Sequence, residues 1–301
     1  MNWYLIALIP PLLHAIANHI DKHLISRYFK NGGVGSLVIF TSFFAFMALP
    51  IIYFINPAVL DVENKTSIAL LLNGTLSLLY VIFYLYALEI DEVSIVAPLF
   101  QTIPIFGFIL GFLILGESLT TSQLLASVLI IMGALLLSLD LNAGLKIKKK
   151  LVLLTLTSSF FYALNGAIFK FIAVSTGFSE SLFWGMVGQV FLGIVLYTCI
   201  KSYKTQFLSV IKENSVAVFS LNFLNGMIIL IGDIVLAFAF LLAPLTLVLA
   251  IGGFQPLFVF ILGILMTLFF PKFGKESFEK KLLIQKFTGI AIIVIGSLLI
   301  S

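Results

Sequence analysis

Hydrophobic positions in this 301-residue chain form long continuous runs, and short polar stretches separate them. The run LLASVLIIMGALLLSL at 124–139 does not alternate apolar and polar residues, as a strand of a membrane barrel would. Because a helix that crosses a bilayer needs about 20 predominantly apolar residues, the runs predict an all-α integral membrane protein with ten transmembrane helices. The predicted spans are 3–20, 34–55, 67–88, 94–115, 121–139, 151–174, 179–200, 215–241, 244–270 and 284–300.

Composition indicates the same class of protein. Hydrophobic residues make up 61% of the chain, and the mean hydropathy is +1.20, so a water-soluble fold would have too few polar residues for its surface. The first run lacks a basic start and a small-residue cleavage site, and we expect it to remain as a helix. The single cysteine, Cys199, excludes an intrachain disulfide and a multi-cysteine metal site.

The two halves of the chain repeat each other. At an offset of 148 residues, HAIANHIDK at 14–22 aligns with YALNGAIFK at 162–170. At an offset of 152 residues, identical residues recur at Asn73 and Asn225, Pro104 and Pro256, Phe106 and Phe258, and Gly111 and Gly263.

This repeat predicts the organisation of the chain. We expect a first five-helix repeat at 1–140, a linking loop at 141–150 and a second five-helix repeat at 151–301. Because each repeat has an odd number of spans, the second one enters the membrane from the opposite side. Inverted repeats of this kind are typical of secondary transporters, whose binding site lies near the bilayer midplane between the halves.

One stretch of the first repeat carries a resemblance to a known family. SIVAPLFQTIPIFGFILGFLILGESLT at 94–120, followed by QLLASVLIIMGALLLS, resembles the EamA-type members of the drug/metabolite transporter superfamily. The second repeat departs from the pattern, because FFPKFGKESFEKK replaces LGESLT. The resemblance implies a ten-helix carrier, commonly an exporter of amino acids or other small metabolites. Its most specific residues are Pro104, Gly111, Gly116, Glu117 and Gly133.

Basic residues report how the chain is oriented in the membrane. Fourteen of the 17 Lys and Arg lie in or directly beside the loops that follow odd-numbered spans, and Lys65 lies in the opposite set of loops. Lys22 and Lys170 are set aside as embedded in the membrane. The positive-inside rule therefore predicts cytoplasmic odd loops and both termini outside. The family resemblance implies termini in the cytoplasm instead, and we follow the charge distribution.

Polar residues within apolar spans are functional candidates, because they are costly at membrane depth. In the first span His14, Asn18 and Lys22 are spaced at i, i+4 and i+8 and share one helix face. We predict that this stripe and its repeat counterpart line a central cavity. The counterpart in the sixth span consists of Tyr162, Gly166 and Lys170, with Asn165 beside it.

The end of the first span has two other interpretations. Asp21, Lys22 and His23 are also compatible with a helix that leaves the bilayer, where long side chains reach the interface. His19 and His23 have the i, i+4 spacing of a two-histidine metal face, but no third firm ligand accompanies them. We therefore expect no bound metal.

Asp233, in MIILIGDIVLAFAF, is the only acid embedded well within an apolar span. Lys170 is the 20th residue of the sixth predicted span and Asp233 the 19th of the eighth, which runs in the same direction. We therefore predict that the two side chains pair, and that a proton or a charged substrate separates them. A static ion pair that only holds helices together is the alternative.

The remaining candidates line the predicted cavity or shape its helices. Asn73 and Asn225 are also compatible with hydrogen bonds between packed helices. The full set of cavity candidates is His14, Asn18, Asn73, Gln101, Tyr162, Asn165, Asn225 and Gln255. The candidates for shaping helices are Pro104, Pro256, Gly111 and Gly263, since proline frees backbone carbonyls and glycine allows close approach.

These observations predict a secondary transporter that exports or exchanges a small metabolite, such as an amino acid, by alternating access and proton coupling through Asp233. A flippase of a lipid-linked sugar and a passive channel are the alternatives. The chain has no paired carboxylates, HExxH or nucleotide-binding loop, so we expect no enzyme, cofactor or nucleic-acid partner. The expected partners are a small-molecule substrate, the lipid bilayer of the plasma membrane and a second copy that contacts GFILG at 107–111.

Overall fold

The computed structural model describes residues 2–27, 33–90, 99–139, 148–213, 216–269 and 280–300, and covers the backbone alone at 22–27, 138, 213, 217–218, 280–281 and 300. Helices account for all the regular structure in these ranges, which confirms the all-α prediction. The helices are α1 (Trp3–Arg27), α2 (Val34–Ile55), η1 (Pro57–Leu60), α3 (Asn64–Ile90), α5 (Ile103–Leu115), α6 (Thr121–Ser138), α7 (Lys149–Thr176), α8 (Phe178–Cys199), α9 (Lys201–Glu213), α10 (Val216–Leu242), α11 (Leu245–Ile251), η2 (Gly252–Phe254), α12 (Gln255–Phe269) and α13 (Lys280–Ile300).

The apolar helices correspond to the ten predicted spans. Eight segments of the described chain are long and apolar enough to cross a membrane, and α11, η2 and α12 together form one of them. The other two spans contain the shorter apolar helices Ile103–Leu115 and Thr121–Leu137. Residues 91–98, where the fourth predicted span begins, lie outside the described residues. The ten-helix membrane fold is confirmed.

Local sequence signals explain the turn between the fourth and fifth spans. α5 ends at Gly116, whose φ of 65° places it in the left-handed region that favours glycine. α6 begins at Thr120, whose hydroxyl accepts a hydrogen bond from the Gln123 backbone while the Gln123 side chain accepts one from the Thr120 backbone. This capping box satisfies two backbone donors at the start of the helix.

The short helix α9 was not among the predicted elements. Its lysines indicated a loop, yet Tyr203 and Val210 are buried and Phe207 packs beside them, at the spacing of one helix face. The Tyr203 hydroxyl lies 2.9 Å from that of Tyr86 in α3. Burial, with this hydrogen bond, raises the pKa of Tyr203 well above its usual range, so the hydroxyl stays protonated at physiological pH.

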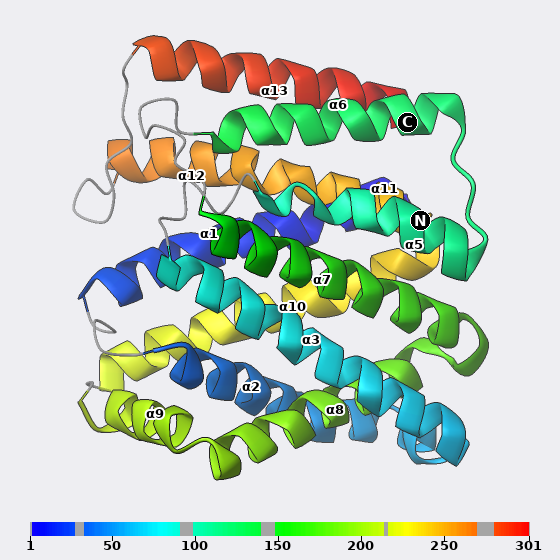
Figure 1. Cartoon of the computed structure of the whole chain (residues 1–301), viewed down its shortest axis with the longest axis vertical. Helices are drawn as coiled ribbons and strands as arrows, with labels where there is room; N and C mark the ends of the chain where they lie inside the picture. Colours follow the sequence, from blue (N-terminus) through cyan, green and yellow to red (C-terminus); the bar gives the residue numbers. More distant parts are fainter. Residues whose placement is uncertain are drawn as a thin grey trace.

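Corresponding helices of the two halves make matching contacts with each other. α3 packs along α7, and α10 packs along α1, while α6 packs along α13 (Figure 1). α1 and α7 are the first spanning helices of the two repeats, and α3 and α10 are the third. In both pairs, the third spanning helix of one repeat therefore packs along the first spanning helix of the other. Two halves related by a two-fold axis produce this pattern. Residues 140–147 lie outside the described residues, so the predicted repeat boundaries stay a prediction.

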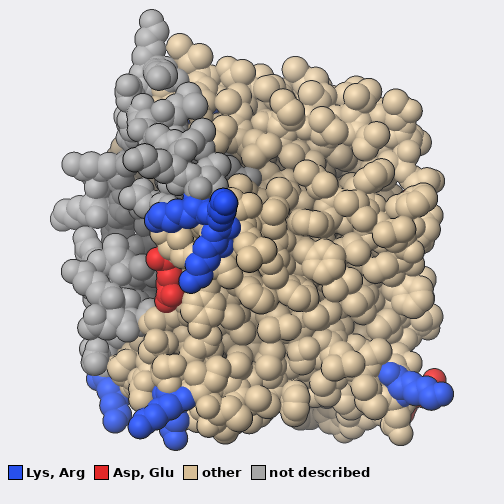
Figure 2. Space-filling model, viewed as in Figure 1, with Lys and Arg blue, Asp and Glu red and all other residues tan. Residues whose placement is uncertain are grey.

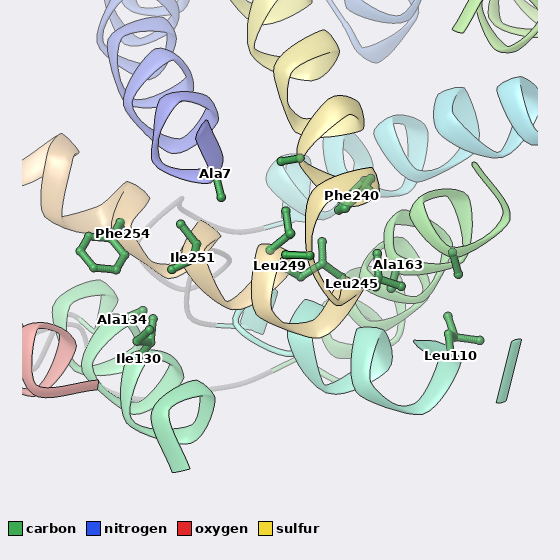
Figure 3. Close-up of a cluster of buried hydrophobic side chains, with 14 of the residues drawn as sticks. Ala7, Leu110, Ile130, Ala134, Ala163, Phe240, Leu245, Leu249, Ile251 and Phe254 are labelled. Carbon is green, nitrogen blue, oxygen red and sulfur yellow. The ribbon is translucent and has the colours of Figure 1, made fainter. Parts of the chain in front are cut away.

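The largest hydrophobic core joins both repeats (Figure 3). It connects Ala7 in the first turns of α1 with Ala173 near the end of α7 and Phe240 near the end of α10. All seven residues of α11 are buried in it or beside it. Both chain termini lie on this side of the molecule (Figure 1).

Charged side chains are distributed unevenly over the surface. In the view of Figure 2, the Lys and Arg side chains gather mainly toward the left, away from the termini, and a small group of both signs lies at the right. Most of the surface between them carries no charged side chain, as expected for a face in contact with lipid.

Candidate functional site

The seam between α1 and α10 contains two polar contacts. Because these helices run antiparallel, His14 meets Asp233 near mid-helix, and the distance between Nε2 and Oδ1 is 3.2 Å. Their side chains are 19% and 44% exposed, so the carboxylate stays accessible. Further along the seam, the Asn225 side-chain amide donates a hydrogen bond of 2.5 Å to Asp21 Oδ1.

A glycine next to Asp233 determines how closely the two helices approach. A Cβ atom at Gly232 would lie 2.8 Å from Nε2 of His14. Glycine at this position therefore leaves room for the imidazole beside the carboxylate.

Helices α3 and α7 supply aromatic side chains to the same region. The rings of Tyr80 and Tyr162 meet edge to face with centroids 4.8 Å apart. Both hydroxyl groups lie within electrostatic range of Asp233. In the repeat, Tyr162 is the counterpart of His14. We call His14, Asp233, Tyr80 and Tyr162 the central layer, to which both repeats contribute.

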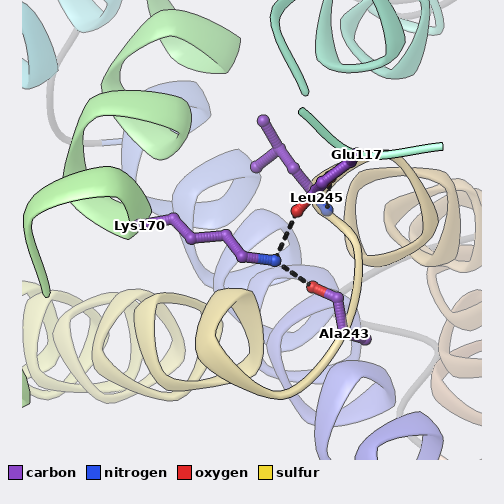
Figure 4. Close-up of polar contacts among 4 residues, drawn as sticks. All are labelled: Glu117, Lys170, Ala243 and Leu245. Atoms are coloured by element: carbon purple, nitrogen blue, oxygen red, sulfur yellow. Dashed lines mark hydrogen bonds and ion pairs between the residues drawn. The ribbon is translucent and has the colours of Figure 1, made fainter. Parts of the chain in front are cut away.

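The predicted ion pair between Lys170 and Asp233 is wrong. Lys170 Nζ lies 2.5 Å from Glu117 Oε1 and donates a hydrogen bond of 2.6 Å to the carbonyl of Ala243 (Figure 4). Glu117 Oε2 accepts a hydrogen bond of 2.7 Å from the backbone of Leu245. We call these four residues the Lys170 cluster.

The predicted pairing failed because residue counts within spans do not fix their relative depth. α7 begins at Lys149 and α10 at Val216, so Lys170 is the 22nd residue of its helix and Asp233 the 18th. Lys170 meets the carbonyl of Ala243, just past the end of α10, whereas Asp233 lies nine residues before that end.

Glu117 was not among the predicted site residues. It stands at the end of α5, bonds the first backbone N–H of α11 and is only 13% exposed. A carboxylate at a helix start is favourable, because unpaired N–H groups and the helix dipole concentrate positive charge there. A Cβ atom at Gly111 would lie 3.0 Å from Glu117 Oε2, which explains the glycine. The signal available in the sequence was the acid that follows an apolar helix directly in LGES.

The predicted asparagines fall in two places. Asn165 donates a hydrogen bond of 2.9 Å to the backbone carbonyl of Asn73, which links α7 to α3. Asn225 lies in the α1–α10 seam with Asp21. Asn18 is exposed, and the Lys22 side chain lies outside the described residues.

The glutamines and prolines lie at helix starts. Gln101 precedes α5 and Gln255 opens α12, and neither is hydrogen bonded to the central layer among the described residues. Pro104 and Pro256 each occupy the first turn of a helix, where a missing N–H removes no helical hydrogen bond. Pro104 therefore begins α5, and Pro256 begins α12 directly after the 3-10 turn η2, within the span Leu245–Phe269.

The remaining sequence features face other helices. His19 Nε2 is hydrogen bonded to the carbonyl of Val259 in α12, and no group of three metal-ligating side chains occurs in the described ranges. In GFILG, a Cβ atom at Gly107 would collide with Leu249, and Gly111 faces Glu117. The motif therefore lies at a close contact between α5 and other parts of the same chain. Gly263 is buried in α12.

The fold and the central layer define a class: a ten-helix integral membrane protein whose two related halves enclose ionisable side chains at mid-depth. Residues 1–139 match the EamA-like transporter family. This match confirms the resemblance to EamA-type transporters of the drug/metabolite transporter superfamily. No curated protein matches the chain.

Solved structures share the fold. One crystal structure, described only as that of a protein, has 14% sequence identity and a TM-score of 0.68, and the match covers 99% of this chain and 96% of that one. The likeness at this identity concerns the fold alone.

Proposed function

We propose that this EamA-type protein is a secondary transporter of the plasma membrane that exports or exchanges a small metabolite, such as an amino acid, by alternating access. The observation that carries the proposal is the His14–Asp233 contact. It lies near the middle of two spans, has tyrosines of the other pair of helices within electrostatic range and leaves the carboxylate 44% exposed. Ionisable groups at this depth are costly, and their usual role is to handle substrates or ions.

The packing suggests which end of the protein is closed in this state. The Lys170 cluster joins the loop after α5, from the first repeat, to α7 and the α10–α11 turn, from the second. The largest hydrophobic core lies beside it and also joins the repeats. Opening toward the termini would separate Glu117 from Lys170, and we propose that this separation accompanies the change of access.

Asp233 offers a way to couple transport to protons. A proton on its carboxylate would cancel the charge that holds His14, and loss of the proton would restore the contact. The tyrosine hydroxyls near Asp233 can donate hydrogen bonds to the ionised form. With the termini outside, as the lysine distribution favours, the Lys170 cluster would close the outer end.

Metabolite profiling tests this proposal. Host cells would express the wild type, Asp233→Asn or Asp61→Asn, beside an empty vector, and the medium would be analysed by mass spectrometry. Asp61 is an exposed acid after η1, so its variant is a matched control for charge removal. We expect one class of compound to accumulate with the wild type and Asp61→Asn alone. Accumulation that is unchanged in Asp233→Asn would reject the role of Asp233, and a medium equal to that of the vector would reject export.

A further inference from the structure

We propose that the solute is an organic amine, bound as its cation by the α1–α10 seam. This inference rests on the proposed transport function and names its substrate class. The seam presents two carboxylates, Asp21 and Asp233, and one imidazole, His14. Among the described side chains of the seam, one net negative charge remains even when His14 is protonated. His14 and Asp21 are seven residues apart on α1, so both carboxylates lie along one face within about 10 Å.

Other basic side chains do not balance this charge among the described residues of α1, α3, α7 and α10. Lys65, Lys149 and Lys150 lie in first helical turns, at the ends of α3 and α7. Lys170 is held by Glu117 and by the carbonyl of Ala243. Among the described side chains, no lysine of these helices therefore neutralises the two carboxylates.

A second observation concerns hydrogen-bond acceptors. Asn225 is 2% exposed, and its Oδ1 has no hydrogen-bond partner although its amide nitrogen bonds Asp21. Asn73, its counterpart in the repeat, is 3% exposed and also has an unpartnered Oδ1. A buried acceptor without a donor is unfavourable. The N–H groups of an ammonium ligand would supply the missing donor next to Asp21.

The aromatic side chains near the carboxylates fit the same ligand. Tyr80 and Tyr162 lie near Asp233, and Tyr84 lies within electrostatic range of Asp21. Aromatic rings attract cations through their faces and also pack against apolar groups. A carboxylate on the solute would need a cationic partner. Among the described side chains of the seam that partner would be His14, which already contacts Asp233. The seam therefore favours an amine without an acid group.

A series of three solutes with one ring and different charge tests the inference. The purified full-length chain in proteoliposomes would be assayed for counterflow of radiolabelled 2-phenylethylamine, with 2-phenylethanol and 3-phenylpropionate as neutral and anionic competitors. We expect the amine to be transported, and the two competitors to inhibit at least about tenfold more weakly than unlabelled amine. Equal inhibition by the three compounds would overturn the inference.

Variants of the α1–α10 seam show which side chains bind the amine. Asp233→Asn and Asp21→Asn should each weaken amine binding by about 10- to 100-fold, whereas the control Asp61→Asn should not change it. His14→Leu should strengthen binding, because it frees the Asp233 carboxylate, and a misfolded protein would not bind more tightly. Weaker binding in His14→Leu, or full binding in both aspartate variants, would contradict the assignment.

The failure of this inference can be told from failure of the transport proposal. If cells that express the wild type release a neutral or anionic compound and the proteoliposomes ignore the amine, the substrate class is wrong and the transport function stands. If neither cells nor proteoliposomes move any solute, both proposals are wrong.

Discussion

In the described part of the chain, two contacts between a basic and an acidic side chain join helices, and they are built differently. Lys170 and Glu117 are 14% and 13% exposed, and two backbone hydrogen bonds, to Ala243 and from Leu245, accompany their contact. His14 and Asp233 are 19% and 44% exposed, and among the described residues no hydrogen bond supplements their contact. The first pair is enclosed and the second is accessible.

The difference separates a structural role from a binding role. A buried charge that loses its partner is strongly destabilising, so the Lys170 cluster should hold one arrangement of the helices firmly. A half-exposed carboxylate loses less when its partner leaves, because water or a ligand can replace it. We propose that the same kind of contact secures one end of the protein and binds solute at the middle.

The largest effect on stability is expected at the enclosed pair. Lys170→Met leaves Glu117 buried without its cation and should lower the free energy of unfolding by about 3–5 kcal/mol. Denaturant unfolding in detergent measures the loss. The double variant Lys170→Met with Glu117→Gln should recover part of it, since no unpaired charge remains. Equal stability of Lys170→Met and wild type would refute the structural role.

Asp233→Asn should show the opposite profile. Removing the accessible charge should reduce the transport rate by about tenfold or more, because a charged hydrogen bond to the solute or proton is lost. The free energy of unfolding should change by less than about 1 kcal/mol. Transport assays and unfolding of the same preparation check both parts. A loss of stability as large as that of Lys170→Met would erase the distinction between the pairs.

Gly232→Ala tests the geometry of the accessible pair without changing its charge. The added methyl group would approach the imidazole of His14 and displace it from Asp233. Because a side chain can shift more easily than a backbone, we expect a cost of about 1 kcal/mol in stability and a transport rate reduced severalfold. Gly226→Ala, on the same helix but facing Phe44, is the comparison. If Gly226→Ala impairs transport as much at equal stability, the spacing beside Asp233 has no special role.

Tyr162→Phe should give the smallest effect. The ring remains against Tyr80, and only the hydroxyl near Asp233 is removed. We expect a transport rate reduced by about two- to fivefold, as for one neutral hydrogen bond. A rate as low as that of Asp233→Asn would instead assign the main role to the hydroxyl.

The sequence was sufficient for the membrane fold and for part of the site. Hydropathy located the spans because length and apolar content decide which helices cross a bilayer. The embedded acid Asp233 and the stripe that contains His14 were identified because ionisable groups at depth are rare. Both residues do meet at the central layer.

Side-chain partners could not be predicted in the same way. Hydropathy fixes neither the relative depth nor the rotation of two helices, so Lys170 was assigned to Asp233 although it contacts Glu117. The role of Glu117 depends on the backbone N–H of Leu245, which is distant in sequence. In α9 the lysines concealed an amphipathic pattern centred on Tyr203.

We propose that the accessible His14–Asp233 contact is the transport site. Solute release should be compared between cells that express the wild type, Asp233→Asn and Asp61→Asn at equal abundance in the membrane. We expect release at the vector background for Asp233→Asn and at the wild-type rate for Asp61→Asn. Release by Asp233→Asn at the wild-type rate would show that this contact is not the transport site.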